Sequence, residues 1–205
     1  MIENFMNLML DIETGCATDA FEAAKKITFN KLSKAELARL ADVVTDGIDI
    51  HNKEAAVYAI ALIENKSQAL TILNDILSTL ENHERVRGRA AEGLGLISPS
   101  RKFKLRISVE KTLLKSLNDP SPTVRFWSCY AVSAMTLKSA LPVLKELQSK
   151  DKGICPGWWY VAEEAEDAIA RITNPELELE YRIPVEQRRN QSENQSGTDP
   201  NKKSQ

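Results

Sequence analysis

Few residues of this chain have the types and spacing that catalysis or metal binding requires. Its two histidines include one His-Glu pair, His83-Glu84, of the imidazole and carboxylate kind that suits iron. The only other histidine is His51, so the chain has too few His-Glu pairs to form a metal centre. We therefore interpret His83 as an exposed turn residue. The three cysteines lack C-x-x-C spacing, and neither G-x-S-x-G nor a phosphate-loop sequence is present. We therefore expect no catalytic residue, no metal ligand and no cofactor.

Basic and acidic residues concentrate in different parts of the chain. Residues 83–106 hold seven basic and two acidic side chains, a net charge of +5, whereas residues 163–180 hold one basic and seven acidic ones, a net charge of −6. Such a separation can steer an oppositely charged partner or support head-to-tail self-association. For an acidic protein partner, the candidate basic contacts are Arg85, Arg89, Arg101, Lys104, Lys111, Lys115 and Lys145.

All three tryptophans lie in the second half of the chain, at Trp127, Trp158 and Trp159. Aromatic side chains often anchor protein interfaces, because they bury a large area at a small entropy cost. They equally serve to close the end of a stack of helices. We take the three tryptophans as further candidate partner contacts, with internal packing as the competing role.

The overall composition bounds the class of protein. The 205 residues are 42% hydrophobic and 27% charged with a net charge of −2, as in soluble globular proteins. Only eight Gly and eight Pro are present, which disfavours a β-sandwich or barrel. No apolar run approaches the ~18–20 residues of a membrane helix, and the N-terminal stretch reads as an amphipathic helix rather than a signal peptide. An odd number of cysteines without a disulfide pattern favours a reducing compartment, so we expect a cytoplasmic protein with no membrane partner.

The elements that must position these residues repeat along the chain. Residues 86–97 and 124–135 share the pattern V-R-x-x-small-small-x-small-apolar-small-x-apolar, which places the apolar positions on one helix face. Weaker copies begin at residues 19, 55 and 161, so the copies are 31 to 38 residues apart, a period typical of helix-pair repeats. Between them lie leucine-rich helical patterns, which we expect to form the second helix of each pair, at 33–44, 70–80, 109–117 and 141–147.

Two details of the repeated pattern predict how neighbouring helices pack. Gly93 and Gly95 each cost about 1 kcal/mol of helix propensity relative to alanine, so we expect a neighbouring helix to approach closely there. Arg87 and Arg125 occupy the same repeat position. We interpret them as ladder residues that pair with acids of the inter-repeat turns, such as Asp119 or Glu84, rather than as contacts for an anionic ligand.

Residues 119–151 resemble a HEAT repeat, of the short kind that includes the bilin-lyase HEAT-like repeats. The resemblance rests on the turn, the start of the helix that follows it, and the start of the next helix, which read Asp119-Pro120, Val124-Arg125 and Ala140-Leu141-Pro142. It is strongest over residues 83–173. It implies a right-handed superhelix of stacked helix pairs, with the second helices along the concave side, and commonly a protein-binding role.

We predict an all-α, right-handed α-solenoid of about four to five HEAT-like helix pairs over residues 1–183. A disordered polar tail is expected over residues 184–205, because that segment has too few apolar residues to form a core. The favoured function is a non-enzymatic scaffold that binds a protein through its concave helix face. Two alternatives stay open. One is an enzyme subunit of the bilin-lyase kind, which would need an apolar, aromatic pocket. The other is a nucleic-acid-binding HEAT-like protein, supported only by the basic segment.

Overall fold

The structure is a computed structural model that describes residues 4–29, 31–97 and 107–196. Within these residues the chain is helical, with no strand, and the prediction of an all-α solenoid is confirmed. The elements are α1 (Phe5–Thr14), α2 (Ala17–Ile27), α3 (Lys34–Asp46), α4 (Ile50–Leu62), α5 (Lys66–Ser78), α6 (Glu84–Ile97), α7 (Ile107–Ser116), α8 (Pro122–Ala134), η1 (Lys138–Ala140), α9 (Leu141–Lys150), α10 (Val161–Thr173) and α11 (Val185–Ser196).

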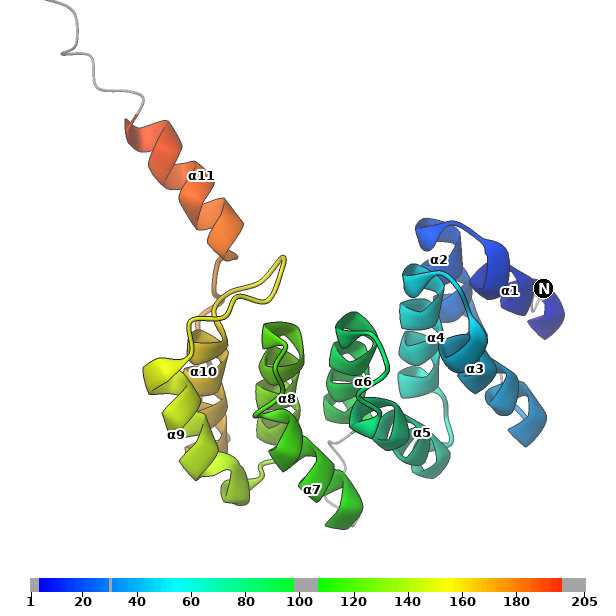
Figure 1. The fold of residues 1–205 in the computed structure, drawn as a ribbon, viewed down its shortest axis with the longest axis horizontal. Helices are drawn as coiled ribbons and strands as arrows, with labels where there is room; N and C mark the ends of the chain where they lie inside the picture. Colours follow the sequence, from blue (N-terminus) through cyan, green and yellow to red (C-terminus); the bar gives the residue numbers. More distant parts are fainter. Residues whose placement is uncertain (1–3, 30, 98–106, 197–205) are drawn as a thin grey trace, which may run out of the picture.

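The helices stack in two rows (Figure 1). The inner row consists of α2, α4, α6, α8 and α10, each of which packs closely on the next. The outer row consists of α3, α5, α7 and α9, and among the described helices of this row only α5 and α7 are in appreciable contact, less closely than any two neighbours of the inner row. Because helices are closer together in the inner row, the array curves toward that row, which forms its concave side.

This arrangement corrects the expectation about the concave face. The patterns at 109–117 and 141–147 were expected to line it, but they form α7 and α9 of the outer row. The physical reason is the size of the packed side chains. The inner-row helices carry glycine, alanine and serine at their contacts, so they approach one another closely, whereas leucine-rich helices hold their neighbours apart.

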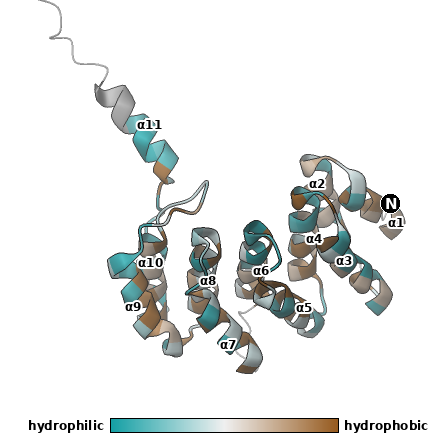
Figure 2. Ribbon diagram, viewed as in Figure 1, coloured by the Kyte–Doolittle hydropathy of each residue, from teal (hydrophilic) through white to brown (hydrophobic). Residues whose placement is uncertain are grey.

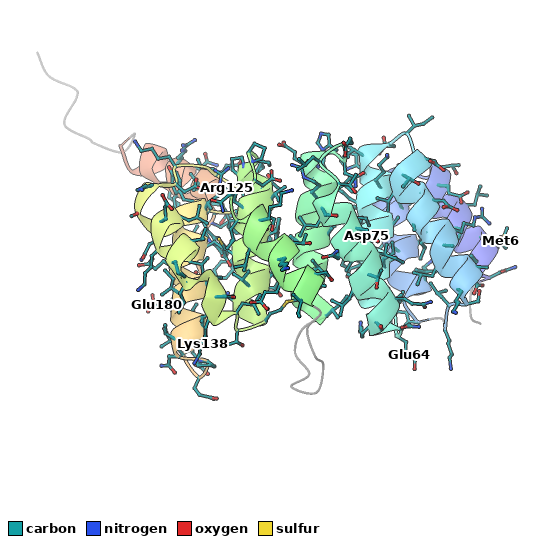
Figure 3. All side chains as sticks on the ribbon, turned by 60° about the horizontal axis from the view of Figure 1, so that its bottom comes forward. Met6, Glu64, Asp75, Arg125, Lys138 and Glu180 are labelled. Atoms are coloured by element: carbon teal, nitrogen blue, oxygen red, sulfur yellow. The ribbon has the colours of Figure 1, made fainter. Side chains whose placement is uncertain are left out.

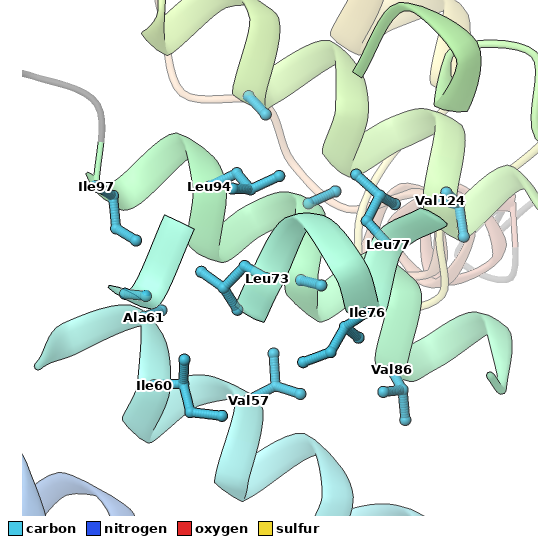
Figure 4. Close-up of a cluster of buried hydrophobic side chains, with 14 of the residues drawn as sticks. Val57, Ile60, Ala61, Leu73, Ile76, Leu77, Val86, Leu94, Ile97 and Val124 are labelled. Atoms are coloured by element: carbon cyan, nitrogen blue, oxygen red, sulfur yellow. The ribbon is translucent and has the colours of Figure 1, made fainter. Parts of the chain in front are cut away.

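The core is one continuous layer between the two rows. Figure 4 shows part of this core. Leu73 and Leu77 of α5 belong there to the same buried cluster as Val57 and Ile60 of α4 and Leu94 of α6. All five side chains are buried. Stacked repeats bury their apolar faces only against their neighbours, so the stability of the array is shared along its length.

The glycines of α6 permit the close approach that their position in the repeat predicts. A Cβ atom on Gly93 would lie 2.8 Å from the Ala61 Cβ of α4. On the other side of α6, a Cβ atom on Gly95 would lie 2.7 Å from the Tyr130 Cε1 of α8. Both distances are too short for real carbon contacts, so α6 can sit between α4 and α8 at this spacing only with glycine at both positions.

The C-terminal segment differs from the predicted disordered tail at its start. Residues 185–196 form α11, whose first residues are hydrophilic apart from Val185 (Figure 2). Val185 is buried, and its backbone N–H donates to the Trp158 carbonyl oxygen at 3.0 Å. Arg188 donates to both carboxylate oxygens of Glu163 at 2.7 and 2.8 Å. These two residues dock the first turn of α11 at the start of α10; residues 197–205 lie outside the described residues.

In the part of the chain that the structure describes, no helix has both the length and the apolar character needed to cross a membrane.

Candidate inner-face binding site

A pocket of about 280 Å³ opens on the inner row, where α4, α6 and α8 meet the loop between α9 and α10. We call it the inner-face pocket. It is lined by Glu54, Arg85, Arg89, Thr123, Trp127, Cys155, Pro156 and Trp158. Four of the residues predicted as partner contacts, two arginines and two tryptophans, therefore meet in one place.

Carboxylates hold the two pocket arginines in position. Arg85 and Arg89 are four residues apart on α6 and share one helix face. The Arg85 Nε donates to Glu54 Oε1 at 3.2 Å, and its Nη2 donates to the second oxygen of the same carboxylate. The Arg89 Nη1 donates to Glu92, and its guanidinium lies 5.8 Å from the ring centre of Phe21 on α2. Because both guanidinium groups are already oriented, a bound acceptor would not need to order them.

Aromatic rings form the other wall of the pocket. Trp127 and Trp158 meet edge to face with ring centres 5.2 Å apart, and Trp127 meets Tyr130 in the same way at 5.8 Å. Phe126 packs behind them and is fully buried. Trp158 keeps 38% of its surface exposed, whereas Trp159 keeps only 8%. Trp158 is therefore available to a partner, and Trp159 is a packing residue in this structure.

A buried carboxyl group lies behind this aromatic wall. Glu164 of α10 is almost completely buried and accepts a hydrogen bond from the Trp159 Nε1 at 3.0 Å. Loss of hydration raises the pKa of Glu164 to about 7, although Arg171, whose Nη1 lies 3.8 Å from its Oε1, opposes the rise. The carboxyl group therefore changes its charge close to neutral pH.

The cysteine thiols of this region are unreactive at neutral pH. Burial raises the pKa of Cys155, which lines the pocket, to about 12, and it raises the pKa of the fully buried Cys129 as well. A thiol is a nucleophile only as its thiolate. Over the described residues, no three His, Cys, Asp or Glu side chains gather to hold a metal ion.

The ladder interpretation of the repeated arginines is confirmed. Arg87 donates to both oxygens of Asp119 at 2.8 and 3.1 Å, and this pair is buried. Arg125 pairs with Asp151 in the same way at 2.6 and 3.0 Å. Each arginine thus reaches the turn acid of the next repeat, which ties neighbouring repeats together.

The ion pairs also change the interpretation of the basic segment 83–106. Its three arginines on α6 are all paired with carboxylates, Arg85 with Glu54, Arg87 with Asp119 and Arg89 with Glu92. The described part of the segment is therefore not a free basic patch.

The remaining predicted contacts lie elsewhere. Lys111 and Lys115 are exposed on α7, and Lys145 is exposed on α9, so all three belong to the outer row and lie away from the pocket. Arg101 and Lys104 lie outside the described residues. The structure therefore divides the predicted contact set between the two sides of the array.

Half of the residues that line the pocket were not among the predicted contacts, although the repeat pattern contains a signal for some of them. Glu54, Arg85 and Thr123 each stand directly before the first core residue of their repeat copy. Arg89 and Trp127 stand four residues later on the same face. Comparing these two positions across the copies, in place of comparing core positions, would have identified the inner-face residues. Cys155 and Pro156 come from a loop outside the repeat, and no pattern indicated them.

Comparison with known families supports the repeat assignment. Residues 73–155, which extend from α5 past the end of α9, match the family model for HEAT repeats. The matched segment includes five of the eight residues that line the inner-face pocket. No curated protein matches the chain.

Proposed function

We propose that this chain, which is a HEAT-repeat protein, acts as a non-enzymatic scaffold that binds a protein partner through the inner row of its helices. The observation that carries the proposal is the inner-face pocket, where the Trp127 and Trp158 rings meet the guanidinium groups of Arg85 and Arg89. Tryptophan and arginine are the residues most enriched among the energetic hot spots of protein interfaces.

The lining of the pocket supports a partner segment that carries a carboxylate beside an apolar side chain. Two guanidinium groups and a single carboxylate, that of Glu54, line it. A carboxylate on the partner would accept from N–H groups of Arg85 and Arg89 beyond those that bind Glu54 and Glu92, while its apolar neighbour packs on Trp158.

Neither alternative function gains a specific observation from the described residues. Of the basic residues that suggested nucleic-acid binding, the three described ones, on α6, are paired with carboxylates. The inner-face pocket has aromatic rings on one side but Glu54, Arg85 and Arg89 on the other, so it is not the apolar, aromatic pocket that an enzyme subunit of the bilin-lyase kind would need. We therefore develop only the scaffold function.

The proposal is tested with the partner that co-purifies with the tagged chain, once that partner has been purified separately. Thr123→Arg places a large side chain in the pocket, and Trp158→Ala removes its exposed ring. We expect each variant to keep its helical circular dichroism and to lose at least about tenfold in affinity, or roughly 1.4 kcal/mol. Lys111→Glu/Lys115→Glu on the outer row serves as the control and should bind like the wild type. Wild-type affinity in both pocket variants would refute an inner-face site.

A further inference from the structure

The outer row contains a groove between α3 and α5. Two hollows of about 310 and 270 Å³ lie side by side and share Leu37 and Gln68, so they form one continuous depression, which we call the α3–α5 groove. Leu32, Leu37 and Ala38 form its wall on the α3 side, and Ile63, Gln68 and Ile72 form the facing wall. It lies on the opposite row from the inner-face pocket.

The groove exists because the outer row opens at this point. α5 and α7 pack on each other, whereas α3 and α5 stay apart although both pack on α4. Leu37 and Ile63 are buried at the bottom of the gap, whereas Leu32 and Ile72 are half-buried and Ala38 is exposed, so part of the apolar lining stays open to solvent. From Asn65 to Ile72 the groove extends over about two helical turns of α5, a length suited to the apolar stripe of a partner helix.

The charges at one end of the groove indicate which charge the partner's side chains should carry there. Lys31 and Lys34 are exposed there, and neither has an ion-pair partner within the described residues. α3 and α5 both begin at this end, capped by Ser33 and Asn65, so their dipoles add positive potential. Glu64, which projects into solvent (Figure 3), is the one carboxylate of the lining. An apolar helix flanked by acidic side chains matches this combination.

A second copy of the chain is a poorer match than a different protein. Its most suitable element is α1, at the end of the array (Figure 3), which exposes Met6 and Leu10 at 54% and 56%. These two side chains are one turn apart, whereas the groove is two turns long.

We propose that the α3–α5 groove is a second docking surface, which takes an amphipathic helix of a partner protein whose apolar stripe is flanked by acidic residues at the Lys31 and Lys34 end. The inference is independent of the inner-face pocket and does not rest on the proposed function. A chain with both surfaces would hold one protein on its concave side and another on its outer side.

A synthetic peptide tests the groove directly. The probe is an acetylated helix of roughly 18 residues, with leucines spaced to form one stripe and glutamates on both sides of it. It is titrated into the full-length chain carrying labelled Leu, Ile and Val methyl groups, and binding is followed by nuclear magnetic resonance. We expect saturable shifts at Leu37, Ile63 and Ile72, and at least tenfold weaker binding of the same peptide with lysine in place of glutamate. No shift up to about 1 mM peptide would overturn the inference, as would shifts confined to Val86 and Val124, which follow the pocket residues Arg85 and Thr123 in the chain.

Two variants and one control separate docking from nonspecific attraction. Ala38→Trp fills the exposed part of the groove, and Lys31→Glu/Lys34→Glu reverses the charge at its end. We expect the first variant to abolish peptide binding and the second to weaken it about tenfold, most strongly at low salt. Lys111→Glu/Lys115→Glu makes the same charge change on α7, outside the groove, and should leave the affinity unchanged. If the control lost as much affinity for the peptide, the loss would come from the change in net charge alone, and the proposal would be contradicted.

Sedimentation of the protein without peptide tests whether a second copy of the chain occupies the groove instead. A monomer at all concentrations agrees with the proposal. Concentration-dependent dimers that both Ala38→Trp and Met6→Ser/Leu10→Ser abolish would show that a second copy fills the groove, and the proposal of a different partner would then be wrong.

Discussion

Replacing Glu164 by glutamine should make the protein more stable at neutral and alkaline pH. The pKa of this carboxyl group is about 7 in the folded chain, against 4.5 for an ordinary glutamate, because burial removes its hydration. The folded state therefore keeps a proton between pH 4.5 and pH 7 that the unfolded state releases. Stability falls across this pH range and stays lower above it. At about 1.4 kcal/mol for each pKa unit, the full effect is at most roughly 3 kcal/mol.

Glutamine resembles the protonated carboxyl group, so it removes the penalty of a buried charge. Its side-chain oxygen can still accept the hydrogen bond from the Trp159 Nε1. We expect Glu164→Gln and the wild type to be similarly stable near pH 4.5, and the variant to gain up to about 3 kcal/mol by pH 8. The assay is urea unfolding followed by far-ultraviolet circular dichroism at several pH values, and the difference between the two proteins removes the contributions of other groups.

Glu163 provides a control, because ionisation of its carboxyl group should have the opposite effect on stability. Its hydrogen bonds with Arg188 lower its pKa, so its charged form stabilises the fold, and this contribution is lost as the pH falls through the lowered pKa. Glu163→Gln should therefore be less stable than the wild type at pH 8. A Glu164→Gln variant whose stability difference from the wild type does not change between pH 5 and pH 8 would refute the assigned cause.

Three further predictions concern the fold. Val124→Asp should abolish cooperative thermal unfolding, because position 124 is fully buried and offers no partner for a charge; native-like melting would contradict the packing of α8. Asp119→Ala should cost about 3–5 kcal/mol in urea unfolding, since it leaves the buried Arg87 without its carboxylate, and a loss below about 1 kcal/mol would show that the ladder does not hold the repeats together. Deleting residues 192–205 should leave the thermal midpoint unchanged, whereas deletion from Val185 should lower it; equal midpoints would show that the first turn of α11 does not stabilise the array.

Several features of the fold could be predicted because they depend on residues that are close together in the chain. The steps between core positions in 86–97 and 124–135 define helices, since a helix face recurs every three or four residues. The capping box at Ser33 and Glu36, also local, marks the start of α3. The pairing of Arg87 with Asp119 was accessible too, because a repeat of known period places the next turn acid beside it.

The division of the candidate contacts between the two sides was accessible only from the tertiary structure. Which row is concave depends on how closely helices from different repeats approach, and α6 with its glycines settles this through Ala61 and Tyr130, residues distant in the chain. The same applies to the docking of α11, whose composition predicts disorder but whose Val185 and Arg188 find partners at the start of α10.

The sequence by itself determined an all-α repeat array and the kinds of residue that could bind a partner. The tertiary structure decided which of those residues are available. Arg85 and Arg89 carry a positive charge in any conformation, and Glu92 stands one turn from Arg89 on the same helix, but only the fold places Glu54 beside Arg85 and the Trp127 and Trp158 rings opposite. Helix formation follows from interactions three or four residues apart, whereas a pocket requires contacts between helices more than thirty residues apart, and these depend on the packing of the whole array.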